Sequence, residues 1–152
     1  MTTGIARRVA ELLADLRRDV EVHLLGHSLG GIVMRYFAQE VGDPRIVQTI
    51  SLASPFGGMR KLSWTGLPLA RDMAPGSALL RKLQLGSRRS VSLPHLSIVA
   101  DSDLVVRPPA AHTLIGGDVF TVRNCGHNAL LYDRAALQAV VRRVLQLRRP
   151  AR

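Results

Sequence analysis

GHSLGG, residues 26–31, is the stretch that decides how this chain is interpreted. It follows an apolar run, Val20 to Leu25, and precedes a helix-like segment, Ile32 to Val41. A G-x-S-x-G pattern between a strand and a helix predicts a sharp turn that lifts the Ser28 hydroxyl above a sheet as a nucleophile. We expect side chains in place of Gly26 and Gly30 to collide with neighbouring backbone. The alternative is a glycine- and serine-rich turn that only packs a helix on a sheet.

A nucleophilic serine needs a base to accept its proton and a third group to orient that base. Two later apolar runs, Leu96 to Ala100 and Val119 to Val122, are predicted strands. The first is followed by Asp101 and Asp103, and the second leads through a short loop to His127. The carboxyl ends of parallel strands share one edge of a sheet, where sites form. The residues themselves leave the choice between the two aspartates open.

These residues carry a family resemblance that covers most of the chain. The sequence resembles the C-terminal part of an α/β-hydrolase, most closely the bacterial lipases and esterases. The matching segments keep the family's order: residues 26–31, 52–58, 75–80, 102–106 and 126–128.

The resemblance implies a catalytic triad of Ser28 as nucleophile, Asp103 as acid and His127 as base. The backbone amide of Leu29 is implied as the first donor to the oxyanion. Asp103 is preferred because the family's acid precedes a short valine-containing turn, and Leu104-Val105-Val106 follows it here. Asp101 is the rival, and its alternative function is to cap a loop amide.

The resemblance begins one helix before the elbow, so we expect a truncated domain without the family's N-terminal strands. No H-G motif, the usual source of the second oxyanion donor, precedes Ser28 in this chain. The strand Val20 to Leu25 would then be an exposed edge that invites self-association. An inactive fragment, or a subunit completed by a partner, is therefore an alternative to an enzyme.

The predicted fold class is α/β: one domain over residues 1–152, with a mostly parallel sheet of about four strands flanked by helices. Ile46 to Leu52 is the remaining strand. Residues 57–92 have a looser pattern, which favours a small cap or lid over an acyl site. Packing of these residues on the sheet is an equal alternative.

The last helix is expected to begin at Asp133 as its N-cap. Its predicted inner face consists of five apolar residues at helical spacing: Leu137, Val140, Val141, Val144 and Leu145.

Composition and motifs argue against nucleic-acid binding, a bound cofactor and an internal disulfide. The net charge is +10, but the arginine pairs are dispersed and aromatic residues are scarce, so we expect solvated faces and no nucleic-acid partner. No nucleotide fingerprint or metal-ligand spacing indicates a cofactor. One cysteine, Cys125, excludes an internal disulfide. No signal-peptide or membrane-span pattern occurs, so the chain as it stands is expected in the cytoplasm.

The expected activity is hydrolysis of carboxylic, lipid-like esters of small molecules through an acyl-enzyme on Ser28. Acyl transfer and thioester hydrolysis use the same triad and remain open.

Overall fold

The computed structural model describes residues 2–59, 71–89 and 93–147. Four parallel strands form one sheet in the order β1-β2-β3-β4. Their bounds are Val22–His27 for β1, Ile46–Leu52 for β2, His95–Ala100 for β3 and Asp118–Val122 for β4. The predicted α/β class with about four strands is confirmed. In the described residues β1 is an edge strand, as expected.

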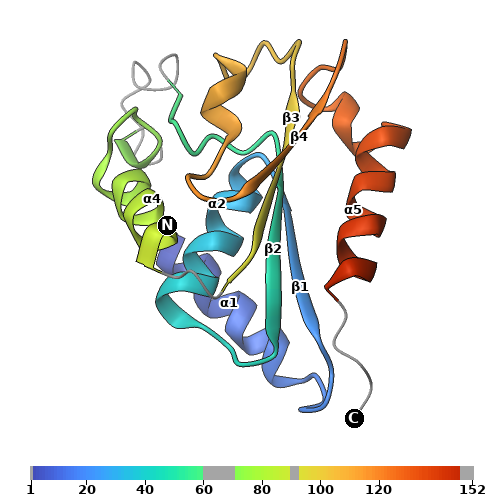
Figure 1. Cartoon of the computed structure of the whole chain (residues 1–152). Coiled ribbons are helices and arrows are strands. Elements are labelled where there is room, and N and C mark those ends of the chain that lie inside the picture. The colour runs from blue at the N-terminus through green and yellow to red at the C-terminus, as the bar shows by residue number, and fades with distance from the viewer. Residues whose placement is uncertain (1, 60–70, 90–92, 148–152) are drawn as a thin grey trace.

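Helices cover both faces of the sheet (Figure 1). One face carries α1 (Thr2–Ala14), α2 (Leu29–Tyr36) with its π-helical extension η1 (Phe37–Val41), and α4 (Ala78–Arg89). The other face carries α5 (Arg134–Gln146). Two short 3-10 turns, η3 (Pro109–His112) and η4 (Ala129–Leu131), complete the described elements. No helix among the described residues is long and apolar enough to cross a bilayer.

Three apolar clusters hold these layers together. Beneath α1 and α2, Leu13 and Phe37 pack with Val22 and Leu24 of β1. Between α2 and α4, Ile32 packs with Leu80, Leu83, Phe56 and Leu114. The third cluster lies between the sheet and α5. The helix α4 therefore packs on the body of the domain, while residues 60–70 of the expected cap lie outside the described residues.

The inner face of α5 differs from the prediction. Ala136 and Ala139 are buried against the sheet, with Val140 and Val144 packed beside them. Three residues of the predicted face are exposed instead: Leu137 at 63%, Val141 at 49% and Leu145 at 58%. The helix thus turns its small residues to the sheet, which allows a close approach. Asp133 is confirmed as the N-cap, because its Oδ1 accepts the Ala136 amide at 2.9 Å.

Candidate active site

Ser28 lies in the tight turn between β1 and α2, with φ 52° and ψ −124°. Positive φ is strained for a residue with a side chain. The turn is fixed because the Ser28 amide donates to the Leu52 carbonyl of β2 at 2.8 Å. The Ser28 side chain does not cap α2. A strained serine with a hydroxyl not used for capping is the geometry of a nucleophile elbow.

Two glycines, Gly26 and Gly31, allow the close packing at this turn. The sequence predicted Gly26 and Gly30. A Cβ on Gly26 would lie 2.4 Å from backbone atoms of Gly30 and Gly31. A Cβ on Gly31 would lie 2.0 Å from the Ser54 Oγ. A Cβ on Gly30 would meet nothing within 4 Å, so the expected collision there is wrong. The close approach of α2 to the sheet is made at Gly31, one residue further on.

Asp103 and His127 meet at the carboxyl ends of β3 and β4. The His127 Nδ1 lies 2.6 Å from the Asp103 Oδ2. The other oxygen of the carboxylate, Oδ1, accepts the amides of Val105 at 2.7 Å and Val106 at 3.0 Å. The carboxylate can only accept when ionised, so His127 donates from Nδ1, which leaves its Nε2 unprotonated in the neutral ring. This is the tautomer of a general base.

The surroundings of Asp103 favour its ionised form. Its side chain is fully buried, whereas 9% of the His127 side chain is exposed. Burial works against ionisation, but hydrogen bonds from Val106, His127 and Val105 outweigh it and lower the pKa of Asp103. The carboxylate is therefore charged at neutral pH and orients the His127 ring.

The rival aspartate lies elsewhere. Asp101 is exposed, its Oδ1 accepts the Ser102 hydroxyl at 2.9 Å, and the Cys125 amide lies 3.4 Å from the same oxygen. It holds the loop after β4 to the loop after β3, which matches the capping alternative. Cys125 itself is buried in the apolar cluster beneath α5, and burial raises the pKa of its thiol.

The elbow touches the His127 loop through its variable residue, His27. The His27 Nε2 lies 3.0 Å from the His127 carbonyl oxygen, and the two ring centroids are 4.8 Å apart. Because a carbonyl only accepts, the His27 Nε2 carries the proton. Within the described part of the chain, no hydrogen bond joins the Ser28 hydroxyl to the His127 ring. Such bonds are often long in a free enzyme and shorten when substrate binds.

His112 is a residue that sequence reasoning missed. It follows two prolines and two alanines between two predicted strands, and it is fully buried at the end of η3. Its Nε2 lies 2.9 Å from the Val106 carbonyl oxygen and 3.3 Å from the Asp103 Oδ2. The only sequence signal was its context: the prolines and alanines at positions 108–111 favour a packed turn over a solvated one.

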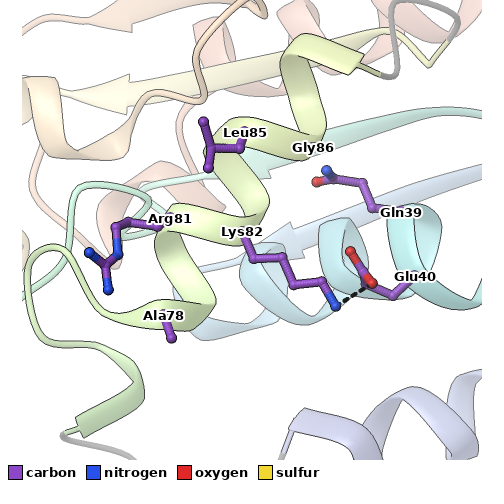
Figure 2. Close-up of a pocket in the computed structure, with 7 residues that line it drawn as sticks. All are labelled: Gln39, Glu40, Ala78, Arg81, Lys82, Leu85 and Gly86. Atoms are coloured by element: carbon purple, nitrogen blue, oxygen red, sulfur yellow. Dashed lines mark ion pairs between the residues drawn. The ribbon is translucent and has the colours of Figure 1, made fainter.

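A separate hollow of about 750 Å³ lies between η1 and α4 (Figure 2). Seven residues line it: Gln39, Glu40, Ala78, Arg81, Lys82, Leu85 and Gly86. An ion pair of 2.5 Å between Lys82 and Glu40 crosses it. None of the seven is Ser28, Asp103 or His127, so this hollow does not belong to the candidate active site. Among the residues that the model describes, no group of three His, Cys, Asp or Glu side chains is placed to hold a metal ion.

Comparison with solved structures shows that the chain has the α/β-hydrolase fold. Lipase B of Aspergillus fumigatus superposes with a TM-score of 0.71 at 19% identity, over 92% of this chain and 40% of that one. A monoacylglycerol lipase of Paleococcus ferrophilus gives 0.60 at 14% identity, over 95% and 74%. Acyl-protein thioesterase 2 of Zea mays gives 0.63 at 15% identity, over 95% and 64%.

A match to a protein-family model identifies the family. Residues 1–93 match the model of the palmitoyl protein thioesterases, and the chain belongs to that family. The predicted resemblance to a partial α/β-hydrolase is thereby confirmed. A comparison with curated proteins finds no match. The chain spans 40% of the length of the Aspergillus lipase.

Proposed function

We propose that the protein is an acyl hydrolase that uses Ser28, His127 and Asp103 as its catalytic triad. His127 Nε2 accepts the Ser28 proton while the Ser28 oxygen attacks the acyl carbonyl carbon. Asp103 holds the ring and stabilises the imidazolium. The proton on His127 then passes to the leaving alcohol or thiol. Water, deprotonated by His127, releases the acid and restores Ser28.

The contact between His27 and His127 carries this proposal. It ties the residue next to Ser28 to the backbone of the base at 3.0 Å, and the base is bonded to a buried carboxylate at 2.6 Å. Three segments that are distant in the sequence thus supply the three groups at one edge of the sheet. The glycine- and serine-rich turn of the alternative interpretation needs neither the paired carboxylate nor the strained serine.

The backbone amide of Leu29, the first residue of α2, is proposed to donate a hydrogen bond to the developing oxyanion. The first amides of a helix have no partner within the helix and favour negative charge. One such donor contributes on the order of 10²–10³ in kcat.

Carboxylic, lipid-like esters are the first substrate class, as the resemblance to lipases implies. Thioesters are a second candidate, favoured by the family match over residues 1–93. The mechanism is the same for both, because only the leaving group differs. Water as the acceptor distinguishes either from acyl transfer.

The test measures hydrolysis of a p-nitrophenyl acyl ester and of an acyl thioester by the full chain. Release of the phenol or thiol is followed for the wild type, for His127→Ala and for Asp103→Asn. Asp101→Asn is the matched control, because it alters a neighbouring aspartate that does not contact His127. We expect loss of turnover in the first two variants and little change in the control. Turnover that survives His127→Ala, or a wild type that turns over neither substrate, contradicts the proposal.

A further inference from the structure

Asp103 is held by more than the triad requires. Its Oδ1 accepts two amides, from Val105 and Val106. Its Oδ2 is bonded by the His127 Nδ1 at 2.6 Å, and the His112 Nε2 lies 3.3 Å from that same oxygen. Two histidines on different segments therefore lie close to one carboxylate oxygen.

The protonation of His112 follows from its neighbours. Its Nε2 faces the Val106 carbonyl at 2.9 Å and the Asp103 carboxylate, both of which only accept. Nε2 therefore carries a proton, which it donates to the Val106 carbonyl, and the Asp103 Oδ2 lies 3.3 Å from the same nitrogen. Burial, which is complete for this side chain, lowers the pKa of His112. The ring is thus neutral, and its Nδ1 is a buried acceptor without a hydrogen-bond partner among the described residues.

The position of His112 is fixed independently of Asp103. The turn η3 is held to the loop after β2 by a 2.7 Å hydrogen bond from the Gly57 amide to the Ala111 carbonyl. A Cβ on Gly57 would lie 2.8 Å from the Ala111 Cα, so the two backbones are in close contact. His112 is therefore a rigid donor that is not displaced by rotation of the Asp103 side chain.

We propose that His112 is a positioning residue: by holding the Val106 carbonyl, it fixes the turn whose amides orient the Asp103 carboxylate toward the His127 Nδ1. It touches no substrate and acts only through Asp103. This inference rests on the proposed triad. His112 supports the triad but is not a member of it. Without His112, the turn at Val105 and Val106 would lose its anchor, and the Asp103 carboxylate would no longer hold the His127 ring in a fixed orientation. Misplacement of a catalytic group by about 1 Å can cost on the order of 100-fold in rate.

The test compares three variants. His112→Gln carries an amide nitrogen with the reach of Nε2, whereas the His112→Asn amide is too short to reach the Val106 carbonyl. His95→Gln is the control, because His95 is also buried in the sheet but bonds to Thr49, Ser51 and Ser97 instead. We expect His112→Asn to lower kcat on the order of tenfold with little change in KM. His112→Gln is expected to recover most of that loss.

Proton NMR supplies a readout that needs no turnover. The His127 Nδ1 proton, bonded to a buried carboxylate, is expected as a downfield resonance in the wild type. We expect it to move in His112→Asn and to stay in place in His95→Gln and His112→Gln. Nitrogen shifts of the wild-type His112 ring are expected to show the neutral Nε2–H form. A His127 resonance unmoved in His112→Asn, or a protonated Nδ1 on His112, overturns the inference. A wild type that shows the resonance without turnover would instead contradict the proposed function.

Discussion

The His27 ring donates from Nε2 to the backbone carbonyl of His127 at 3.0 Å, and the two rings are tilted by 53°. His27 occupies the first variable position of the G-x-S-x-G turn, directly before Ser28. Its contact makes the elbow and the loop that carries the base one unit. A residue outside the proposed triad thus contacts the residue proposed as the base.

Replacement of His27 tests this coupling. We expect His27→Ala to free the His127 carbonyl and reduce the rate of ester hydrolysis on the order of tenfold, because the base is no longer held beside the elbow. His27→Gln retains an amide donor and is expected to lose less. Both rates are measured with the p-nitrophenyl ester. Equal rates for His27→Ala and the wild type would show that the contact does not position the base.

Strain at Ser28 has a measurable consequence for stability. Ser28→Gly removes the side chain from a residue with φ 52°, so we expect the free energy of unfolding to rise by about 1 kcal/mol. Ser28→Ala keeps a Cβ in the same conformation and is expected to gain nothing comparable. Urea denaturation of both variants gives the difference. A glycine variant that is less stable than the alanine variant contradicts the strain.

Gly30 and Gly31 form a matched pair on α2. A Cβ on Gly31 would lie 2.0 Å from the Ser54 Oγ and 2.9 Å from the Ser51 Cβ, whereas one on Gly30 meets nothing within 4 Å. We expect Gly31→Ala to destabilise the fold by about 1–3 kcal/mol through overpacking. Gly30→Ala is expected to be neutral or stabilising by up to about 1 kcal/mol, because alanine favours helices. Urea midpoints that rank the two variants in the opposite order would refute this packing.

Stability should fall in acid because of His95. Burial, followed by the charges of Arg35 and Arg143, lowers the pKa of His95 from 6.5 to about 3. Above pH 6.5 the ring is neutral in both states, and between pH 6.5 and about 3 only the unfolded chain binds the proton. The free energy of unfolding therefore decreases as pH falls through this window, by up to about 1.4 kcal/mol per pH unit for one proton.

Urea denaturation of wild type and His95→Gln between pH 4 and 7 measures this dependence. We expect a shallower slope in the variant, with the remainder due to other groups such as His112, whose pKa burial also lowers. Identical slopes for the two proteins would assign the acid sensitivity to groups other than His95.

The central strands β2 and β3 were predictable because strands that are buried on both faces are rich in apolar residues. The range Ile46–Leu52 agrees with β2 at both ends, while β1 is displaced toward the elbow and ends at His27, which pairs with Leu52. The prediction of which residues of α5 face the sheet was wrong because it followed hydrophobicity alone. Leu137 and Val141 carry a stronger hydrophobic signal than Ala136 and Ala139, yet the alanines allow the helix to approach the sheet.

The site was predictable only in part. The order of Ser28, Asp103 and His127 could be interpreted from the motifs, since each follows a predicted strand. The contacts that support them could not, because they depend on how loops pack on one another. His112 lies near Asp103 only because the connection from β3 to β4, which contains η3, brings it back to Val106, and no local pattern specifies that path.

Covalent labelling by a fluorophosphonate tests directly whether Ser28 is the nucleophile. The full chain is treated with the reagent, digested and analysed by mass spectrometry, with Ser28→Ala and His127→Ala treated in parallel. We expect a phosphonyl adduct on the Ser28 oxygen of the wild type, none in Ser28→Ala, and a strongly slowed reaction in His127→Ala. An unlabelled wild type, or an adduct that persists in Ser28→Ala, would contradict it.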